Sequence, residues 1–121
     1  MEKPLILVVD DCAVTLKITG RYLENAGFEV ISRSRPIGTT AEIFKMKPDL
    51  VLLDVLMPGL TGDKITKLIR ESGIATKIVL HSGKENNELQ ELSKECGADG
   101  YIKKTNDKHE FINKVKSFLS S

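Results

Sequence analysis

The sequence predicts one α/β domain, a (βα)5 arrangement in which a doubly wound parallel sheet carries helices on both faces. Three observations favour this fold class. Short aliphatic runs alternate with longer segments of helical periodicity along the chain. A length of 121 residues suits one domain with one core, and 40% hydrophobic with 29% charged residues is an ordinary globular composition. Five strand–helix units are too few for an eight-stranded barrel, so we expect an open sheet.

Five short segments are expected to form the strands. Leu5–Val9, Leu50–Leu53 and residues 78–80 are uninterrupted aliphatic runs, as in strands that are buried on both faces of a parallel sheet. Residues 28–32 and 101–102 are interrupted or flanked by polar residues and glycine, which is typical of strands at the sheet margins. The first, third and fourth strands are therefore placed inside, and the predicted strand order is 2-1-3-4-5.

The first two helices are indicated by apolar spacing and by the residues that follow them. The first has an apolar residue at every fourth position and ends at Gly27, which suits a left-handed turn. A second helix is expected from about residue 40 to 47, because Pro48 disfavours helical backbone before it. The apolar stripe of the first helix comprises Val14, Ile18, Tyr22 and Ala26.

The remaining three helices have clearer boundaries. The third and fourth stripes are followed by Gly73 and Gly97, which we expect to end these helices. The last helix begins at Asp107 as its N-cap, with Glu110 three residues later. The three apolar stripes are Ile65, Leu68 and Ile69; Leu89, Leu92 and Cys96; and Phe111, Ile112, Val115, Phe118 and Leu119.

Polar residues that could bind a ligand or take part in a reaction lie where the predicted strands end. In a sheet of order 2-1-3-4-5, the crevice lies at the carboxyl ends of the first and third strands, where the order reverses. Three carboxylates at one place repel each other and raise each other's pKa unless a cation lies among them. Oxygen ligands without histidine or cysteine favour Mg²⁺ over zinc. The residues at this edge are Asp10, Asp11, Asp54, Ser82 and Lys104.

Most of these residues have a structural explanation when taken singly. Asp11 would suit the N-cap of the first helix. Ser82 and Glu85 match a capping box, and a lone Lys104 would be a solvated lysine. Asp54 is different, because a turn at Met57 and the residues after it separates it from the next helix. Asp54 is therefore the strongest candidate for a functional carboxylate.

A carboxylate beside a divalent ion, an ammonium and a hydroxyl can accept a phosphoryl group as an aspartyl phosphate. The sequence lacks the glycine-rich loops of nucleotide-binding domains and has no loop suited to a flavin phosphate. A serine–histidine–aspartate triad is disfavoured, because His81 and Ser82 are adjacent and point to opposite faces of a strand. We expect His81 to be a packed side chain at the strand end.

Charge and composition restrict the partners and the compartment. The formal net charge is +1, so no general electrostatic field attracts nucleic acid or a membrane surface. The sequence has no transmembrane run, and the apolar stretch Leu5–Val9 is too short for the core of a signal peptide. The two cysteines lack metal-ligand or redox spacing. We therefore expect a cytoplasmic protein that binds other proteins.

Four motifs in register resemble the receiver domain of bacterial two-component response regulators, including single-domain regulators of the chemotaxis type. They are V-V-D-D at 8–11, P-D-L-V-L-L-D-V-L-M-P-G-L-T-G at 48–62, H-S-G at 81–83 and G-A-D-G-Y-I-K-K at 97–104. The resemblance covers residues 1–121 and implies a flavodoxin-like fold. It implies a phosphorylation-dependent switch that receives its phosphoryl group from a sensor histidine kinase, a phosphotransfer protein or a small phosphodonor. The switch would act on a downstream protein through the face formed by the fourth helix, fifth strand and fifth helix.

The resemblance also implies roles for individual residues. Asp54 matches the phosphoacceptor, and Asp11 and Asp10 match the direct and the water-mediated ligands of Mg²⁺. Ser82 and Lys104 match the hydroxyl and the ammonium that contact the phosphoryl oxygens. Leu56 matches the position whose backbone carbonyl binds the metal, and Tyr101 matches the aromatic switch residue. Such a domain is not an enzyme in the usual sense, because it catalyses at most its own phosphorylation and a slow dephosphorylation.

Two positions depart from the family pattern. Thr105 replaces the usual proline after the lysine, so the loop is either trans and differently shaped or strained. Lys103 is consequently a rival to Lys104. His81 occupies a position that is usually apolar. These departures support an alternative hypothesis, a phosphorylation-independent interaction module with the same fold, whereas a small phosphatase or a flavoprotein would lack its required loops.

Overall fold

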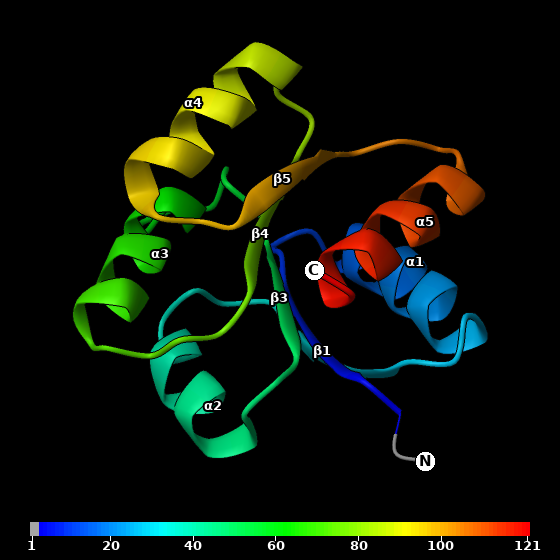
Figure 1. Ribbon diagram of the computed structural model, residues 1–121, viewed down its shortest axis with the longest axis horizontal. Helices are drawn as coiled ribbons and strands as arrows, with labels where there is room; N and C mark the ends of the chain where they lie inside the picture. Colours follow the sequence, from blue (N-terminus) through cyan, green and yellow to red (C-terminus); the bar gives the residue numbers. More distant parts are fainter. Residues whose placement is uncertain (1–2) are drawn as a thin grey trace.

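The computed structural model describes residues 3–121 and shows a five-stranded parallel sheet with helices on both faces (Figure 1). The strand order is β2-β1-β3-β4-β5, which confirms the prediction. The strands are β1 Leu5–Val9, β2 Glu29–Arg33, β3 Leu50–Leu53, β4 Ile78–Ser82 and β5 Gly100–Lys103. The helices are α1 Ala13–Asn25, α2 Thr39–Met46, α3 Gly62–Glu71, α4 Asn86–Cys96 and α5 Lys108–Leu119.

The hydrophobic core lies in two layers, one on each face of the sheet. On one face, Leu23 of α1 and Phe111 of α5 pack against Ile6 and Val8 of β1. On the other face, α2 and α3 pack against the opposite side chains of β1 and β3, and α4 covers Leu80 of β4. Figure 1 shows the same division, with α1 and α5 on one side of the sheet and the other helices on the opposite side. Among the helices of residues 3–121, none is both long and apolar enough to span a membrane.

The strand predictions are confirmed, with shifts of one or two residues at the margins. β1 and β3 have the predicted bounds, and β3 and β4 are buried throughout. β4 continues two residues further than its aliphatic run, through His81 and Ser82, because pairing with β5 extends there. β2 is half-exposed along its length, as expected of an edge strand.

The predicted buried face of α1 is wrong in part. Val14 and Ile18 are 67% and 46% exposed, and the buried face is formed by Leu16, Thr19, Gly20 and Leu23. The reason is that Leu16 and Leu23 pack into the core with Ile6 and Val8 of β1, which leaves Tyr22 and Ala26 of the predicted stripe only partly buried against that core. In α3, Leu68 of the predicted stripe is likewise 47% exposed, whereas Ile65 and Ile69 are buried.

The predicted helix ends are confirmed. Gly97 is the C-cap of α4 with φ +86°, a left-handed conformation that favours glycine. Gly27 and Gly73 also have positive φ and follow α1 and α3. Asp107 is the N-cap of α5, and its Oδ1 accepts a hydrogen bond of 3.0 Å from the Glu110 backbone N–H. These local signals fix where the chain turns back towards the sheet.

Candidate functional site

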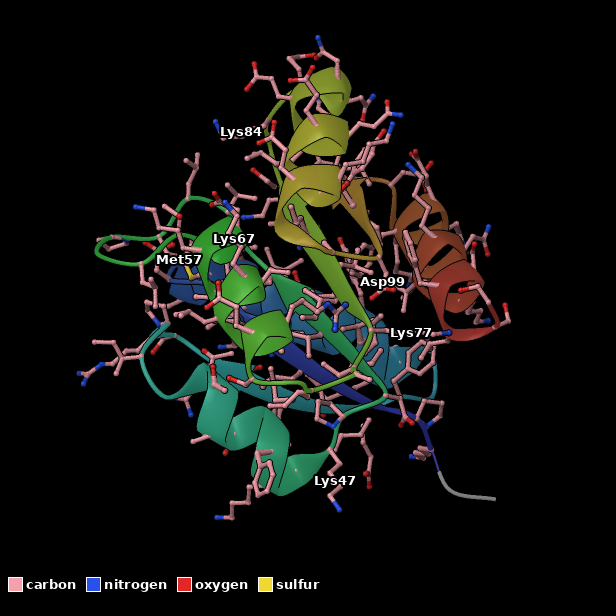
Figure 2. All side chains as sticks on the ribbon, turned by 60° about the vertical axis from the view of Figure 1, so that its left-hand side comes forward. Lys47, Met57, Lys67, Lys77, Lys84 and Asp99 are labelled. Carbon is pink, nitrogen blue, oxygen red and sulfur yellow. The ribbon has the colours of Figure 1, made fainter. Side chains whose placement is uncertain are left out.

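The site lies where the chain leaves the carboxyl ends of β1, β3 and β5. The backbone N–H of Asp54 donates to Val9 at 2.9 Å, so the residues after β1 and β3 start from the same edge of the sheet. The backbone N–H of Lys104 donates to the Ser82 carbonyl at 2.7 Å, which joins the ends of β4 and β5. Figure 2 labels Met57 and Lys84 in the loops after β3 and β4, and Lys77 just before β4, towards the opposite edge.

Three carboxylates meet at this edge. Asp10, Asp11 and Asp54 each place one oxygen within 4.8 Å of the others. Asp10 and Asp54 are buried and Asp11 is exposed. The capping explanation for Asp11 is excluded, because Cys12 is the N-cap of α1 and its backbone N–H donates to Asp10 at 2.9 Å. The structure therefore brings the three predicted acidic residues together.

Lys104 supplies a positive charge to the cluster. Its Nζ lies 2.9 Å from Asp10 Oδ2 and 3.6 Å from Asp54 Oδ1. The rival Lys103 instead places its Nζ 3.5 Å from Glu85, outside the acidic cluster. Every peptide bond that the structure describes is trans, so the loop with Thr105 brings Lys104 to the carboxylates in the trans form. Of the two lysines, Lys104 is the one at the site.

The electrostatics of Asp54 favour a bound cation. The pKa of Asp54 is raised from 3.8 to about 6: burial is the main cause, the Lys104 ammonium opposes it, and the negative charge of Asp10 adds to the rise. One ammonium therefore does not fully offset the burial of these carboxylates. An all-oxygen cluster of this kind matches the ligands that Mg²⁺ prefers. The donor set thus fits the metal that the sequence predicts.

The other predicted site residues lie around this centre. Ser82 is fully buried at the end of β4, and its Oγ accepts a 3.3 Å hydrogen bond from the Lys84 backbone N–H. The capping-box explanation for Ser82 is wrong, because Glu85 is the N-cap of α4. Leu56 is 60% exposed, and its N–H lies 3.4 Å from Asp54 Oδ1. The metal-binding role of the Leu56 carbonyl stays a prediction.

Two aromatic side chains flank the site on opposite faces of the sheet. Tyr101 on β5 is half-buried and packs against the cluster that includes Leu80 and Leu89. His81 on β4 is 6% exposed and stacks on Phe111 of α5 with 5.2 Å between ring centroids. Burial lowers the pKa of His81 to about 4, so the ring is neutral at pH 7. The prediction that His81 is a packed side chain is confirmed.

Gly62 is a positioning residue that the sequence analysis quoted in a motif without giving it a role. It is the first residue of α3, it is buried, and its N–H donates to the Val55 carbonyl at 3.1 Å. A Cβ atom at this position would overlap the backbone carbonyl of Asp54. The spacing M-P-G-x-x-G after Asp54 is the signal that could have identified it. Only glycine lets α3 begin this close to the phosphoacceptor candidate.

The raised pKa of Asp54 predicts a pH dependence of stability. The folded metal-free domain keeps a proton on Asp54 between pH 3.8 and about 6, whereas the unfolded chain loses it. Through this group, the free energy of unfolding should therefore fall as the pH rises across that window. Urea unfolding in the presence of a chelator, measured at several pH values between 3.8 and about 6, should show this decrease in the wild type and not in Asp54→Asn. If the free energy of unfolding changed with pH equally in the two proteins, the assignment of the raised pKa to Asp54 would be contradicted.

The two neighbouring lysines provide a matched test of the electrostatics. Lys104→Met should raise the pKa of Asp54 above about 6, because the ammonium 3.6 Å away is lost. Lys103→Met removes the same charge from a residue whose Nζ pairs with Glu85, so it should leave that pKa unchanged. A ¹³C NMR titration of the Asp54 carboxyl carbon without metal measures both midpoints. Equal changes in the pKa of Asp54 in the two variants would show that Lys104 does not interact with Asp54 more strongly than Lys103 does.

Comparison with known proteins agrees with this geometry. The family model described as the response regulator receiver domain matches residues 6–116. The chain belongs to this family. The receiver domain is 33% identical over 118 residues to the phosphate regulon transcriptional regulatory protein PhoB of Pseudomonas aeruginosa, and 34% identical over 115 residues to the transcriptional regulatory protein ResD of Bacillus subtilis. Both matches cover 94% of this chain but 51% and 47% of the relatives, so the chain spans about half the length of these curated relatives.

Solved structures confirm the fold of the receiver domain. The BeF3-activated N-terminal receiver domain of Klebsiella pneumoniae RstA superposes with a TM-score of 0.88 at 28% identity, and the match covers 97% of this chain and 99% of that one. The chemotaxis protein CheY4 of Vibrio cholerae superposes with a TM-score of 0.88 over the same shares at 24% identity, which supports the fold alone. The flavodoxin-like class predicted from the sequence is thus confirmed.

Proposed function

We propose that this receiver domain is a phosphorylation-dependent signalling switch that accepts a phosphoryl group on Asp54 from a histidine kinase or a phosphotransfer protein. The observation that carries the proposal is the meeting of Asp54 with Asp10, Asp11 and Lys104 at one edge of the sheet. The family provides the class of reaction, and these contacts provide a nucleophile, a site for a cation and a fixed ammonium.

In the proposed transfer, a carboxylate oxygen of Asp54 attacks the phosphorus of a phosphohistidine. The phosphorus–nitrogen bond breaks, the imidazole nitrogen keeps the electron pair, and Asp54 becomes an acyl phosphate. Lys104 and Ser82 would then contact the phosphoryl oxygens, because both belong to the strand ends that face Asp54. A magnesium ion held by Asp10, Asp11, Asp54 and the Leu56 carbonyl would neutralise charge on those oxygens.

Phosphorylation would act as a switch because it adds charge beside Lys104 and Ser82. A phosphoryl group at Asp54 would compete with Asp10 for the ammonium and would attract the Ser82 hydroxyl. Tyr101 lies on the strand next to β4, so its packing against Leu80 can respond to a movement of Ser82. The signal would then pass to a downstream protein at the face formed by α4, β5 and α5 through a shift between two packings.

The proposal gives this domain the role of phosphoacceptor and not of an enzyme with a separate substrate. Cytoplasmic location is part of it, because both Cys12 and Cys96 are free thiols. A net charge of +1 supports protein partners over nucleic acid or a membrane surface.

Intact mass after incubation with acetyl phosphate and Mg²⁺ tests the proposed function. We expect a gain of one phosphoryl group in Mg²⁺ and little or no gain in excess chelator, because the three carboxylates need a cation to admit a phosphoryl dianion. A folded protein that gains no mass under either condition would contradict the proposal. That result would support the alternative, an interaction module that keeps the fold and does not use phosphorylation.

The lifetime of the phosphorylated state depends on Leu56. This side chain is 60% exposed two residues after Asp54, and an apolar group there positions an attacking water poorly. Wild type should therefore lose its phosphoryl group slowly, and Leu56→Asn should lose it faster, by about tenfold. The measurement is the decay of the phosphorylated mass after removal of the phosphodonor. Leu68→Asn makes the same change at an exposed leucine of α3 and should leave the rate of phosphoryl loss unchanged. If Leu56→Asn lost its phosphoryl group no faster than wild type, the prediction would be wrong.

A further inference from the structure

A cavity of about 360 Å³ lies between α1 and α5, beside the acidic site. Figure 1 shows these two helices side by side on the same face of the sheet. Thr15, Thr19 and Tyr22 of α1 line one wall, and Phe111 of α5 lines another. Its volume lies in the lower part of the range of small-molecule sites, roughly 300–1,000 Å³.

His81 contributes a buried hydrogen-bonding group to this cavity. The side chain lines the cavity from β4 and is only 6% exposed. Within residues 3–121, Arg33 Nε is the one fully enclosed side-chain nitrogen or oxygen without a hydrogen-bond partner, so the ring nitrogens of His81 are not sealed in the core. Burial and the charge of Lys104 lower the pKa of the imidazole, Asp10 opposes them, and no hydrogen bond contributes to the shift. The imidazole therefore offers free hydrogen-bonding capacity to the cavity.

The chemistry of the walls selects the kind of occupant. A neutral imidazole presents one N–H donor and one nitrogen acceptor, which suits a group that also carries a donor beside an acceptor. The cavity has no carboxylate among its lining residues to bind a cation. Its one ammonium, on Lys104, is already 2.9 Å from Asp10 and 3.6 Å from Asp54, so an anion would have to compete with two carboxylates. These features favour a neutral ligand.

We propose that this cavity binds a small, neutral, planar molecule with an amide-type edge, such as an aromatic amide or a nucleobase, through hydrogen bonds to His81. The threonine hydroxyls and Tyr22 supply further polar contacts, and Phe111 and Ile18 supply apolar ones. The site is distinct from the acidic cluster, although Lys104 belongs to the walls of both. The proposal does not depend on phosphorylation of Asp54, so it is tested without a phosphodonor.

The test is an NMR titration of the ¹⁵N-labelled 121-residue chain with benzamide. We expect saturable shifts that concentrate on Thr15, Thr19, His81 and Asn106, with a dissociation constant of about 1 mM for so small a probe. Benzoate, the anionic isostere, should bind at least tenfold more weakly. Shifts that do not saturate at the solubility limit, shifts centred elsewhere, or equal binding of benzoate would overturn the proposal.

Three variants separate a hydrogen bond to His81 from general packing. His81→Leu keeps an apolar side chain in the core and should weaken benzamide about tenfold. Thr15→Phe should abolish binding, because it fills the cavity from α1 without changing His81. His109→Leu makes the same histidine substitution at an exposed position of α5 and should have no effect. Equal affinity in folded His81→Leu and wild type would overturn the assignment of His81.

Discussion

Asp54→Asn should abolish the gain of a phosphoryl group from acetyl phosphate in Mg²⁺. The asparagine amide cannot replace the carboxylate oxygen as nucleophile, and the change also removes one of the three charges that favour the metal. The loss should be complete within the sensitivity of intact mass spectrometry, because the other buried carboxylate, Asp10, already has one oxygen bonded to the Cys12 N–H and the other to Lys104. This is the largest effect on function that we expect from one substitution.

A matched control is available on the same side of the sheet. Asp63→Asn makes the same chemical change in the first turn of α3, outside the acidic cluster, and should phosphorylate like wild type. Asp54→Asn should also be at least as stable as wild type at pH 7 without metal, because it removes a carboxylate whose pKa burial raises to about 6. A folded Asp54→Asn protein that still gains one phosphoryl group would show that another residue is the acceptor.

Gly62→Ala should lower the free energy of unfolding by about 3 kcal/mol, because it forces a Cβ atom against backbone that has no room to move. The added atom would meet the Asp54 carbonyl, and Asp54 is itself held by the hydrogen bond from its N–H to Val9 in the central strand β1. Relief of the overlap would move either the start of α3 or Asp54. We therefore expect slower phosphorylation of whatever fraction remains folded.

Gly20→Ala is the control for this substitution. Gly20 is also buried in a helix, but a Cβ atom there would make only ordinary contacts, at 3.9 Å from Ser32 and Val30. Alanine in the middle of α1 should raise the free energy of unfolding by roughly 0.5–1 kcal/mol, because it restricts the unfolded chain more than glycine does. Urea unfolding of the two variants measures both effects. Losses of similar size in both would indicate that burial alone, and not the overlap with Asp54, explains the result.

The elements that could be predicted from the sequence are those with a strong local signal. β1 and β3 are aliphatic and almost fully buried, so their bounds follow from composition alone. The glycines after α1, α3 and α4 and the Asp107 cap of α5 were predictable because each acts within one turn of the helix. The buried face of α1 was not, since Val14 and Ile18 have the right spacing but point away from the sheet. Spacing defines a stripe, and packing decides which stripe is buried.

The sequence by itself determined the alternation of strands and helices and placed three aspartates at strand ends, because hydrophobic period and turn residues act over a few neighbouring positions. The tertiary structure decided that Lys104 and not Lys103 reaches Asp10, and that Gly62 touches the backbone of Asp54. Successive residues of a strand point to opposite faces, and a contact between distant segments depends on the packing of the whole sheet. Which charges meet at the site is therefore a property of the folded domain.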